Sequence, residues 1–301
     1  MNRPSKLAVF VAVGSATLAL SAAAARATEY ETSVVLRGLS RPTGIAVNGS
    51  GTIYFTQIPM PGIGGGMNSV SKFSVGSKDF KVLHQGEPEP THIAVGEDGT
   101  LYWTCKSAGV ILEQDEDGFT SMFLTGLRQP SGISVDRQEN VYFTQLPTPG
   151  VSGMMGGMNT VNVSDGVTID VLTMGEPEPT DIVVGKDGEA YWTCKSAGVI
   201  LERDANGVVS VLLSGLNTPV GIALDHKGEN LYFTEVPTPG VSGFMGGSNQ
   251  VLEYNFLSGE KTVVDFGDPE PTDIAVTPNG NLYWTCTSAG VIVEATPVRK
   301  K

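Results

Sequence analysis

The chain has 301 residues, a formal net charge of −13, 38 glycines and 18 prolines. A strongly acidic chain repels polyanions, so the charge argues against nucleic acid and anionic membrane surfaces as partners. No long stretch shows the apolar period of an amphipathic helix, so we expect short strands joined by turns.

The N-terminus has the three parts of a signal peptide. Arg3 and Lys6 give a positive start, Leu7–Leu20 is an apolar stretch, and Ala25–Ala27 is a cleavage site of small residues around an arginine. The apolar stretch is too short and too often interrupted to span a membrane. We therefore expect residues 1–27 to be removed and the chain to be exported, to the periplasm or the extracellular space, without membrane insertion.

Residues 28–301 consist of internal repeats, which indicate a repeat architecture. The sequence YWTCKSAGVI occurs at Tyr102–Ile111 and at Tyr191–Ile200, and returns as YWTCTSAGVI at Tyr283–Ile292. A second type of unit alternates with these and ends in YFTQ or YFTE, at Arg41–Gln57, Gln129–Gln145 and Thr218–Glu235. The chain thus contains six units of roughly 40–50 residues, as three pairs of an A-type and a B-type unit.

Each unit shows the same order of predicted strands. A Pro-x-Gly/Asp/His-Ile-Ala-Val strand is followed by a turn such as Glu97–Gly99, and then by a Tyr-aromatic-Thr strand. A third strand and a fourth strand follow, for example at Gly109–Gln114 and Phe119–Thr125. Four short antiparallel strands in a unit of this length predict a β-propeller blade.

The two ends of the chain predict how the ring closes. The last unit runs out after its third strand, Val291–Ala295, while Glu31–Leu39 resembles the fourth strand of the other units. The N-terminal segment would then supply the missing outer strand of blade six and leave no open sheet edge. The predicted fold is an all-β, six-bladed propeller of residues 28–301 with pseudo-threefold symmetry.

The repeated motifs carry a resemblance to a known family. Pro-x-Gly-Ile-Ala followed by Asp-Gly-x-Leu-Tyr-Phe-Thr-Glu resembles the blade motif of virginiamycin B (streptogramin) lyase-like propellers, and more loosely that of NHL-repeat and SMP-30-type propellers. The resemblance covers essentially all of residues 28–301, and it implies a fold that is shared by lyases, lactonases and binding modules. It also implies that the residue ending each second strand faces the axial mouth; these residues are Gln57, Cys105, Gln145, Cys194, Glu235 and Cys286.

The same resemblance implies a histidine after the first proline of a blade, and none of the six units has one there. The corresponding residues are Thr43, Thr91, Ser131, Thr180, Val220 and Thr272. Their identity argues against the lyase reaction on the antibiotic ring. An enzymatic alternative of the lyase or lactonase type would use Glu235 as the catalytic residue together with a divalent metal.

The three cysteines Cys105, Cys194 and Cys286 occupy one position of the B-type units. They have four interpretations: buried structural residues copied by duplication, a single disulfide, reactive thiols favoured by Lys106 and Lys195, or ligands of a soft metal ion such as Cu or Zn. The metal interpretation requires the three sulfurs to converge.

Further ligand-binding candidates lie around the same expected mouth. The Glu-Pro-Thr segments contribute one glutamate each, and the B-type first strands carry His92, Asp181 or Asp273 where the A-type strands have glycine. Insertions at Ile58–Asn68, Leu146–Asn159 and Val236–Asn249 bring a methionine-bearing rim. The complete set of ligand-binding candidates is Gln57, Gln145, Glu235, Glu89, Glu178, Glu270, His92, Asp181, Asp273, Met67, Met155, Met158 and Met245.

Together these features predict an exported binding protein that holds a small molecule or a soft metal ion in an axial pocket. Two alternatives remain open from the sequence. One is the metal-dependent enzyme described above. The other is an interaction scaffold that presents its three loops to a protein partner.

Overall fold

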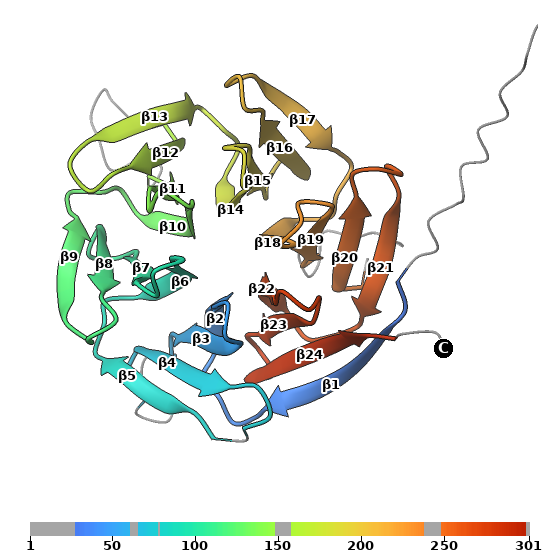
Figure 1. Cartoon of the computed structure of the whole chain (residues 1–301), viewed down its shortest axis with the longest axis horizontal. Coiled ribbons are helices and arrows are strands. Elements are labelled where there is room, and N and C mark those ends of the chain that lie inside the picture. Colours follow the sequence, from blue (N-terminus) through green and yellow to red (C-terminus); the bar gives the residue numbers. More distant parts are fainter. Residues whose placement is uncertain (1–27, 61–65, 78, 148–157, 238–247, 299–301) are drawn as a thin grey trace, which may run out of the picture.

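The computed structural model describes residues 28–60, 66–77, 79–147, 158–237 and 248–298. Within these ranges the chain forms six four-stranded antiparallel sheets arranged as blades around a central axis (Figure 1). The all-β six-bladed propeller predicted from the repeats is therefore confirmed. Among the described residues, none belongs to a helix long and apolar enough to cross a membrane.

The innermost strand of every blade begins at the proline of the repeated motif, and the second strand contains the aromatic-Thr motif. The inner strands of blades 1 to 6 are β2 (Pro42–Val47), β6 (Pro90–Val95), β10 (Pro130–Val135), β14 (Pro179–Val184), β18 (Pro219–Leu224) and β22 (Pro271–Val276). The second strands are β3 (Thr52–Gln57), β7 (Leu101–Cys105), β11 (Val141–Gln145), β15 (Ala190–Cys194), β19 (Asn230–Glu235) and β23 (Leu282–Cys286).

The third and outer strands lie progressively further from the axis and are less buried. The third strands are β4 (Ser69–Ser74), β8 (Val110–Gln114), β12 (Thr160–Ser164), β16 (Val199–Arg203), β20 (Gln250–Asn255) and β24 (Val291–Pro297). The outer strands are β5 (Lys81–Gln85), β9 (Thr120–Leu124), β13 (Ile169–Met174), β17 (Val209–Leu213), β21 (Lys261–Phe266) and β1 (Tyr30–Leu36). We call blades 1, 3 and 5 the A blades, and blades 2, 4 and 6 the B blades.

The ring closes as the sequence predicts. Strand β1, from the N-terminal side of the described chain, pairs antiparallel with β24, so that blade 6 has the strand order β1-β24-β23-β22. In Figure 1 the blue β1 lies along the red β24. Because one sheet is made from both ends of the chain, unfolding of either end opens the ring.

The hydrophobic core is divided among the six interfaces between neighbouring blades. Each interface holds one cluster of buried side chains, as in the Phe55–Phe73–Tyr283 cluster between blades 6 and 1. The indoles of Trp103, Trp192 and Trp284 are fully buried in the interfaces where a B blade packs on the preceding A blade. Aromatic side chains of this size bury a large apolar area, which helps to hold neighbouring blades together.

Candidate metal centre on the propeller axis

The third residue of every inner strand lies in a β-bulge. In blade 1, Pro42 pairs with Gln57 while Ile45 pairs with Phe55, so β2 has one residue more than its partner strand between these points. The other five inner strands shift register at the same place. A bulge bends the strand and redirects a side chain. The residues so placed are Gly44, His92, Gly132, Asp181, Gly221 and Asp273.

A threonine of the second strand holds each bulge in position. In the B blades, the backbone N–H groups of His92, Asp181 and Asp273 each donate to a threonine hydroxyl at 3.2 Å. The A-blade glycines make the same bond at 2.8–3.0 Å. The Thr104 hydroxyl in turn donates to the Ser131 carbonyl of the next blade at 2.7 Å. The threonine of the Tyr-aromatic-Thr motif therefore links the bulge to the neighbouring blade.

The A blades have glycine at this position because the next inner strand approaches too closely for a side chain. A Cβ on Gly132 would lie 2.4 Å from the Cα of Asp181, and one on Gly44 or Gly221 would lie 2.6 Å from the Cα of the following B-blade residue. The glycines thus make room for the three polar B-blade residues. The ring of inner strands is so narrow that a residue with a side chain, His or Asp, can follow only a glycine in the preceding blade.

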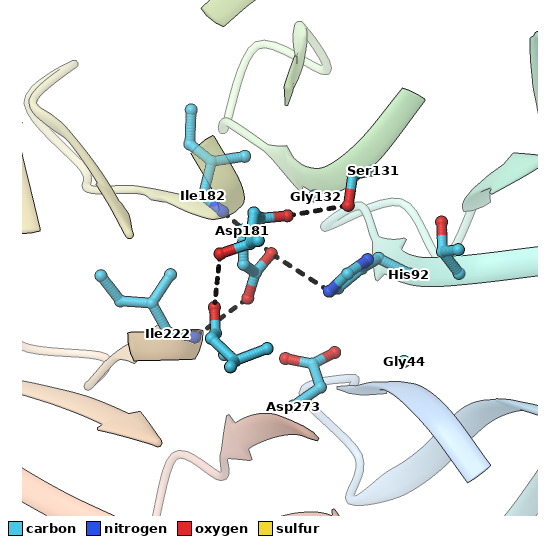
Figure 2. A network of polar contacts seen from close by, with 12 residues as sticks. Gly44, His92, Ser131, Gly132, Asp181, Ile182, Ile222 and Asp273 are labelled. Atoms are coloured by element: carbon cyan, nitrogen blue, oxygen red, sulfur yellow. Dashed lines mark hydrogen bonds and ion pairs between the residues drawn. The ribbon is translucent and has the colours of Figure 1, made fainter. Parts of the chain in front are cut away.

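The three polar side chains meet near the axis. One potential ligand atom from each of His92, Asp181 and Asp273 lies within 4.8 Å of the others, and His92 Nε2 is 4.0 Å from Asp181 Oδ1. All three residues are buried. Figure 2 shows them converging from three different blades. Among the described residues, this is the one group of three or more His, Cys, Asp or Glu side chains with such spacing.

The two carboxylates are fixed by backbone donors from two blades each. Asp181 Oδ1 accepts the N–H of Ile182 at 2.8 Å, and its Oδ2 accepts the N–H of Ile222 at 2.9 Å (Figure 2). Asp273 repeats this pattern with Ile274 and Ile45, both at 2.8 Å. Each oxygen therefore has one backbone donor and keeps lone-pair capacity for a further partner.

His92 has no comparable support. Neither ring nitrogen makes a hydrogen bond within the usual limits, although the ring is buried. Asp181 is 4.0 Å away, and the Ser131 carbonyl is close enough to favour the charged imidazole slightly. A buried polar group without a partner costs about 1–3 kcal/mol. His92 is therefore oriented toward the cluster at a cost in stability.

Burial sets the charge state of the empty cluster. Burial raises the pKa of Asp273 to about 7. Burial, followed by the nearby Asp273 charge, raises the pKa of Asp181 well above its ordinary value. Burial, followed by the Lys106 charge, lowers the pKa of His92 to about 4. At neutral pH the histidine is neutral, and both carboxyls bind a proton more tightly than an exposed aspartate does, so a bound cation would compete with protons for them.

The donor set fits a divalent metal ion. Two carboxylates and one neutral imidazole supply two negative charges and three ligand atoms, which is the number that leaves an exchangeable position on zinc. Tetrahedral ligation at about 2.1 Å places ligand atoms roughly 3.4 Å apart. His92 Nε2 and Asp181 Oδ1 are 4.0 Å apart, so this pair would have to approach by about half an ångström around an ion of that size.

A cavity connects the cluster with the turn side of the propeller. It has a volume of about 180 Å³ and is lined by all six inner strands, with Asp181 and Asp273 in its wall. Further cavities continue at the ends of these strands, where Glu97 and Asp136 line the opening together with Arg137 and Lys186. Arg137 pairs with Glu97 at 3.2 Å, so the opening carries charges of both signs.

The structure separates the three cysteines, so they lack the convergence that the metal interpretation of the thiols requires. Cys105, Cys194 and Cys286 are buried in three different interface clusters, each packed beside the tryptophan of its own strand. Burial raises the pKa of Cys105 and Cys194 to about 12, and it raises the pKa of Cys286 further. The three sulfurs cannot ligate one ion together. Second strands are too far from the axis for their terminal residues to meet.

Gln57, Gln145 and Glu235, which end the A-blade second strands, share one structural contact. Their side-chain Oε1 atoms accept the backbone N–H of Ser40, Arg128 and Asn217 at 2.8, 2.7 and 3.1 Å. Each bond fixes the segment that leads from the outer strand of the preceding blade into the inner strand of the A blade. The expected catalytic residue Glu235 thus occupies a place that a glutamine fills in the other two A blades, although burial raises its pKa.

The remaining candidates lie apart from the axial cluster. Glu89, Glu178 and Glu270 have left-handed backbones with φ of 55–57°, and their carbonyls accept the N–H of the residue after each cysteine. Met67 and Met158 are exposed, at 66% and 58%. Met155 and Met245 lie outside the described residues. The polar candidates from the first strands, by contrast, are brought together.

The backbone and hydroxyl contacts of the site were not foreseen from the sequence. The repeated threonine was visible in every unit, but its bond to a bulge depends on a register shift that periodicity does not reveal. The crowding at Gly44 was visible only as the alternation of glycine with His or Asp in the inner strands. That alternation was the available signal for the axial cluster.

Comparisons with known proteins agree on the fold. No family model matches the chain. A curated relative, Low-density lipoprotein receptor-related protein 1 from Pyricularia oryzae, is 30% identical over 158 residues, which is 46% of this chain. The matched segment spans 48% of that relative, about half of its length.

Solved structures match most of the chain at low sequence identity, which is evidence for the fold alone. A streptogramin B lyase superimposes with a TM-score of 0.62 at 17% identity, over 89% of this chain and 98% of its own. Virginiamycin B lyase from Staphylococcus aureus gives 0.56 at 18%, over 91% and 90%. The nidogen/laminin complex gives 0.58 at 18%, over 75% and 79%. The chain is a six-bladed β-propeller whose fold matches those of streptogramin B lyase, virginiamycin B lyase and the nidogen/laminin complex.

Proposed function

We propose that this protein is a metal-binding propeller whose axis holds one divalent cation between His92, Asp181 and Asp273. The observation that carries the proposal is the convergence of three buried ligand side chains, one of which has no hydrogen-bond partner. A bound ion would give His92 its missing partner. It would also replace the protons that burial forces onto the carboxyls.

The architecture supports binding at this position. Three glycines keep the ring narrow, and four backbone N–H groups hold the carboxylates, so these two ligands are arranged before an ion arrives. Preorganised ligands lower the ordering cost of binding. The cavity on the turn side gives the ion a route to the cluster.

The test is the metal content and the metal affinity of the purified protein. Chelator-treated protein is titrated with Zn²⁺, Mn²⁺, Co²⁺ and Ca²⁺ by calorimetry, and native mass spectrometry gives the stoichiometry. We expect one ion per chain and at least a hundredfold weaker binding in His92→Ala and Asp273→Asn. His92→Ala removes an unpartnered ring, so it should fold even if the Asp273 variant does not.

Two control variants separate the axial site from other cation ligands. Glu116→Gln/Asp117→Asn removes two exposed acidic groups and should leave the affinity unchanged. Cys105→Ala/Cys194→Ala/Cys286→Ala removes all thiols and should retain one ion per chain. Loss of the ion in the thiol variant, with retention in His92→Ala, would overturn the proposal in favour of sulfur ligation.

We also propose that the protein is exported, on the strength of the signal-peptide features of residues 1–27. Those residues lie outside the described ranges. Mass determination of the N-terminus of the protein from its native host tests this directly, and we expect the chain to begin at Thr28. An unprocessed Met1 in the native protein would contradict it.

A further inference from the structure

We infer that His92 is the residue that selects the class of metal ion, favouring Zn²⁺ and similar transition metals over Ca²⁺ and Mg²⁺. The inference rests on the proposed function, because it assigns a role within the same axial site. It follows from a break in the pseudo-threefold symmetry of the ring. Two of the three B blades carry aspartate at this position, and one carries histidine.

The two aspartates define the pattern that the ring repeats. Each binds the N–H of the residue that follows it and the N–H of an isoleucine in the next A blade. In blade 2 the corresponding residues are Ile93 and Ile133. Because the repeat places these two isoleucines as it places the donors of Asp181 and Asp273, we expect a third aspartate at position 92 to bind their N–H groups in the same way.

The packing around position 92 does not explain why this residue is a histidine when the two equivalent residues are aspartates. Gly44 clears the backbone of this residue in the way that Gly132 and Gly221 clear the two aspartates, so all three positions are built alike. Unlike the aspartates, the imidazole leaves two buried nitrogens without hydrogen bonds. Neither hydrogen bonding nor space therefore accounts for the histidine, whereas ligation of a metal does.

The chemistry of the nitrogen ligand determines which ions benefit. Carboxylate oxygens are ligands for Mg²⁺, Ca²⁺ and Mn²⁺, whereas imidazole suits Zn²⁺, Cu²⁺, Fe²⁺ and Ni²⁺. His92 Nε2 is the ring nitrogen 4.0 Å from Asp181 Oδ1, so this nitrogen faces the other ligands. A ring of three carboxylates would take a hard cation, and replacement of one by imidazole shifts the preference toward transition metals.

The test compares affinities for Zn²⁺ and Ca²⁺ in the wild type and in His92→Asp, titrated with each metal alone after chelator treatment. We expect the wild type to bind Zn²⁺ at least a hundredfold more tightly than Ca²⁺, and His92→Asp to reduce this ratio at least tenfold by losing Zn²⁺ affinity and gaining Ca²⁺ affinity. Leu257→Asp is the control for the added carboxylate, because Leu257 is 94% exposed in the turn between β20 and β21, and its ratio should remain that of the wild type.

A spectroscopic readout distinguishes ligation from a structural role. The chain has three histidines, His84, His92 and His226, so ¹⁵N resonances of their rings can be assigned by single substitutions. We expect Zn²⁺ to shift the Nε2 resonance of His92 and to leave those of His84 and His226 in place. Binding by the wild type with an unchanged ratio in His92→Asp, or without a shift at His92, would overturn this inference alone. Absence of any binding by the wild type would overturn the proposed function as well.

Discussion

The B blades carry two sets of three equivalent residues, and only one set converges. His92, Asp181 and Asp273 belong to inner strands and meet within 4.8 Å. The three cysteines belong to second strands and lie in three separate apolar clusters. Both sets arise from the same threefold repetition, so repetition alone does not make a site. The distance of the strand from the axis decides whether symmetric residues meet or only pack.

The two sets also differ in their surroundings, which are apolar for the buried cysteines and polar for the buried axial residues. The thiols pack among valine, isoleucine and tryptophan side chains, and Cys286 also donates to Asp268 Oδ2 at 3.7 Å; both surroundings favour the neutral thiol. The axial carboxyls are equally buried but receive four backbone N–H bonds. A cation can therefore be accommodated on the axis, where backbone N–H groups hold the two carboxylates in position.

The largest expected effect comes from filling the space beside the axial residues. Gly132→Ala places a Cβ 2.4 Å from the Cα of Asp181, and because both groups belong to the backbone of inner strands, neither can move aside. We expect a loss of about 3 kcal/mol or more in the free energy of unfolding, measured by denaturant titration.

Gly49→Ala provides the matched control for that substitution. Its Cβ would meet no atom within 4 Å, and its backbone is not left-handed. We expect a change of at most about 0.5 kcal/mol. Equal losses in both variants would show that glycine at the ring position has no special packing role.

The next effect comes from removing the link between a bulge and the adjacent blade. Thr193→Val deprives the N–H of Asp181 of its acceptor at 3.2 Å, and deprives the Val220 carbonyl of a donor at 2.7 Å. We expect a loss of about 1–3 kcal/mol in the free energy of unfolding. Thr296→Val, at an exposed threonine of β24, serves as the control and should change stability little.

A pH-dependent effect should distinguish the two charge states of the metal-free ring. Burial raises the pKa of Asp273 to about 7 in the folded protein, above its ordinary value of 3.8. The folded state therefore binds the proton more tightly, and stability falls as pH rises from about 4 to 7. In chelator, we expect the free energy of unfolding of the wild type to fall relative to that of Asp273→Asn over this window.

The neighbouring histidine acts in the opposite direction, so the comparison must use differences between variants. Burial lowers the pKa of His92 to about 4, and stability contributed by its neutral form is lost as pH falls below about 6.5. Because His92 is present in both wild type and Asp273→Asn, its contribution largely cancels. Parallel pH profiles for these two proteins would contradict a raised Asp273 pKa.

The smallest effect is expected at Glu235. Gln57 and Gln145 accept the same connector N–H with an amide oxygen, so Glu235→Gln should preserve the contact with Asn217. We expect a change in unfolding free energy below about 0.5 kcal/mol and no change in metal affinity. A large loss of metal affinity in this variant would show that Glu235 takes part in binding, and would support a functional role for its carboxylate.

The fold was predictable because each blade repeats a short motif with clear turns, and because Glu31–Leu39 resembles an outer strand. The axial residues were predictable as candidates, since a histidine or an acid replaces glycine only in the B-type strands. Their convergence was not, because the bulge that redirects them leaves no trace in periodicity. The separation of the thiols was not predictable either. Each cysteine ends a second strand, and a second strand lies further from the axis than the inner strand of its blade.

The most direct measurement is a crystal structure of the protein grown with Zn²⁺, with anomalous diffraction recorded above and below the zinc edge. We expect one strong anomalous peak per chain on the propeller axis, within about 2.0–2.2 Å of His92 Nε2 and of one oxygen each from Asp181 and Asp273. A peak beside Cys105, Cys194 or Cys286, or an axis without a peak in zinc-saturated crystals, would contradict the axial metal site.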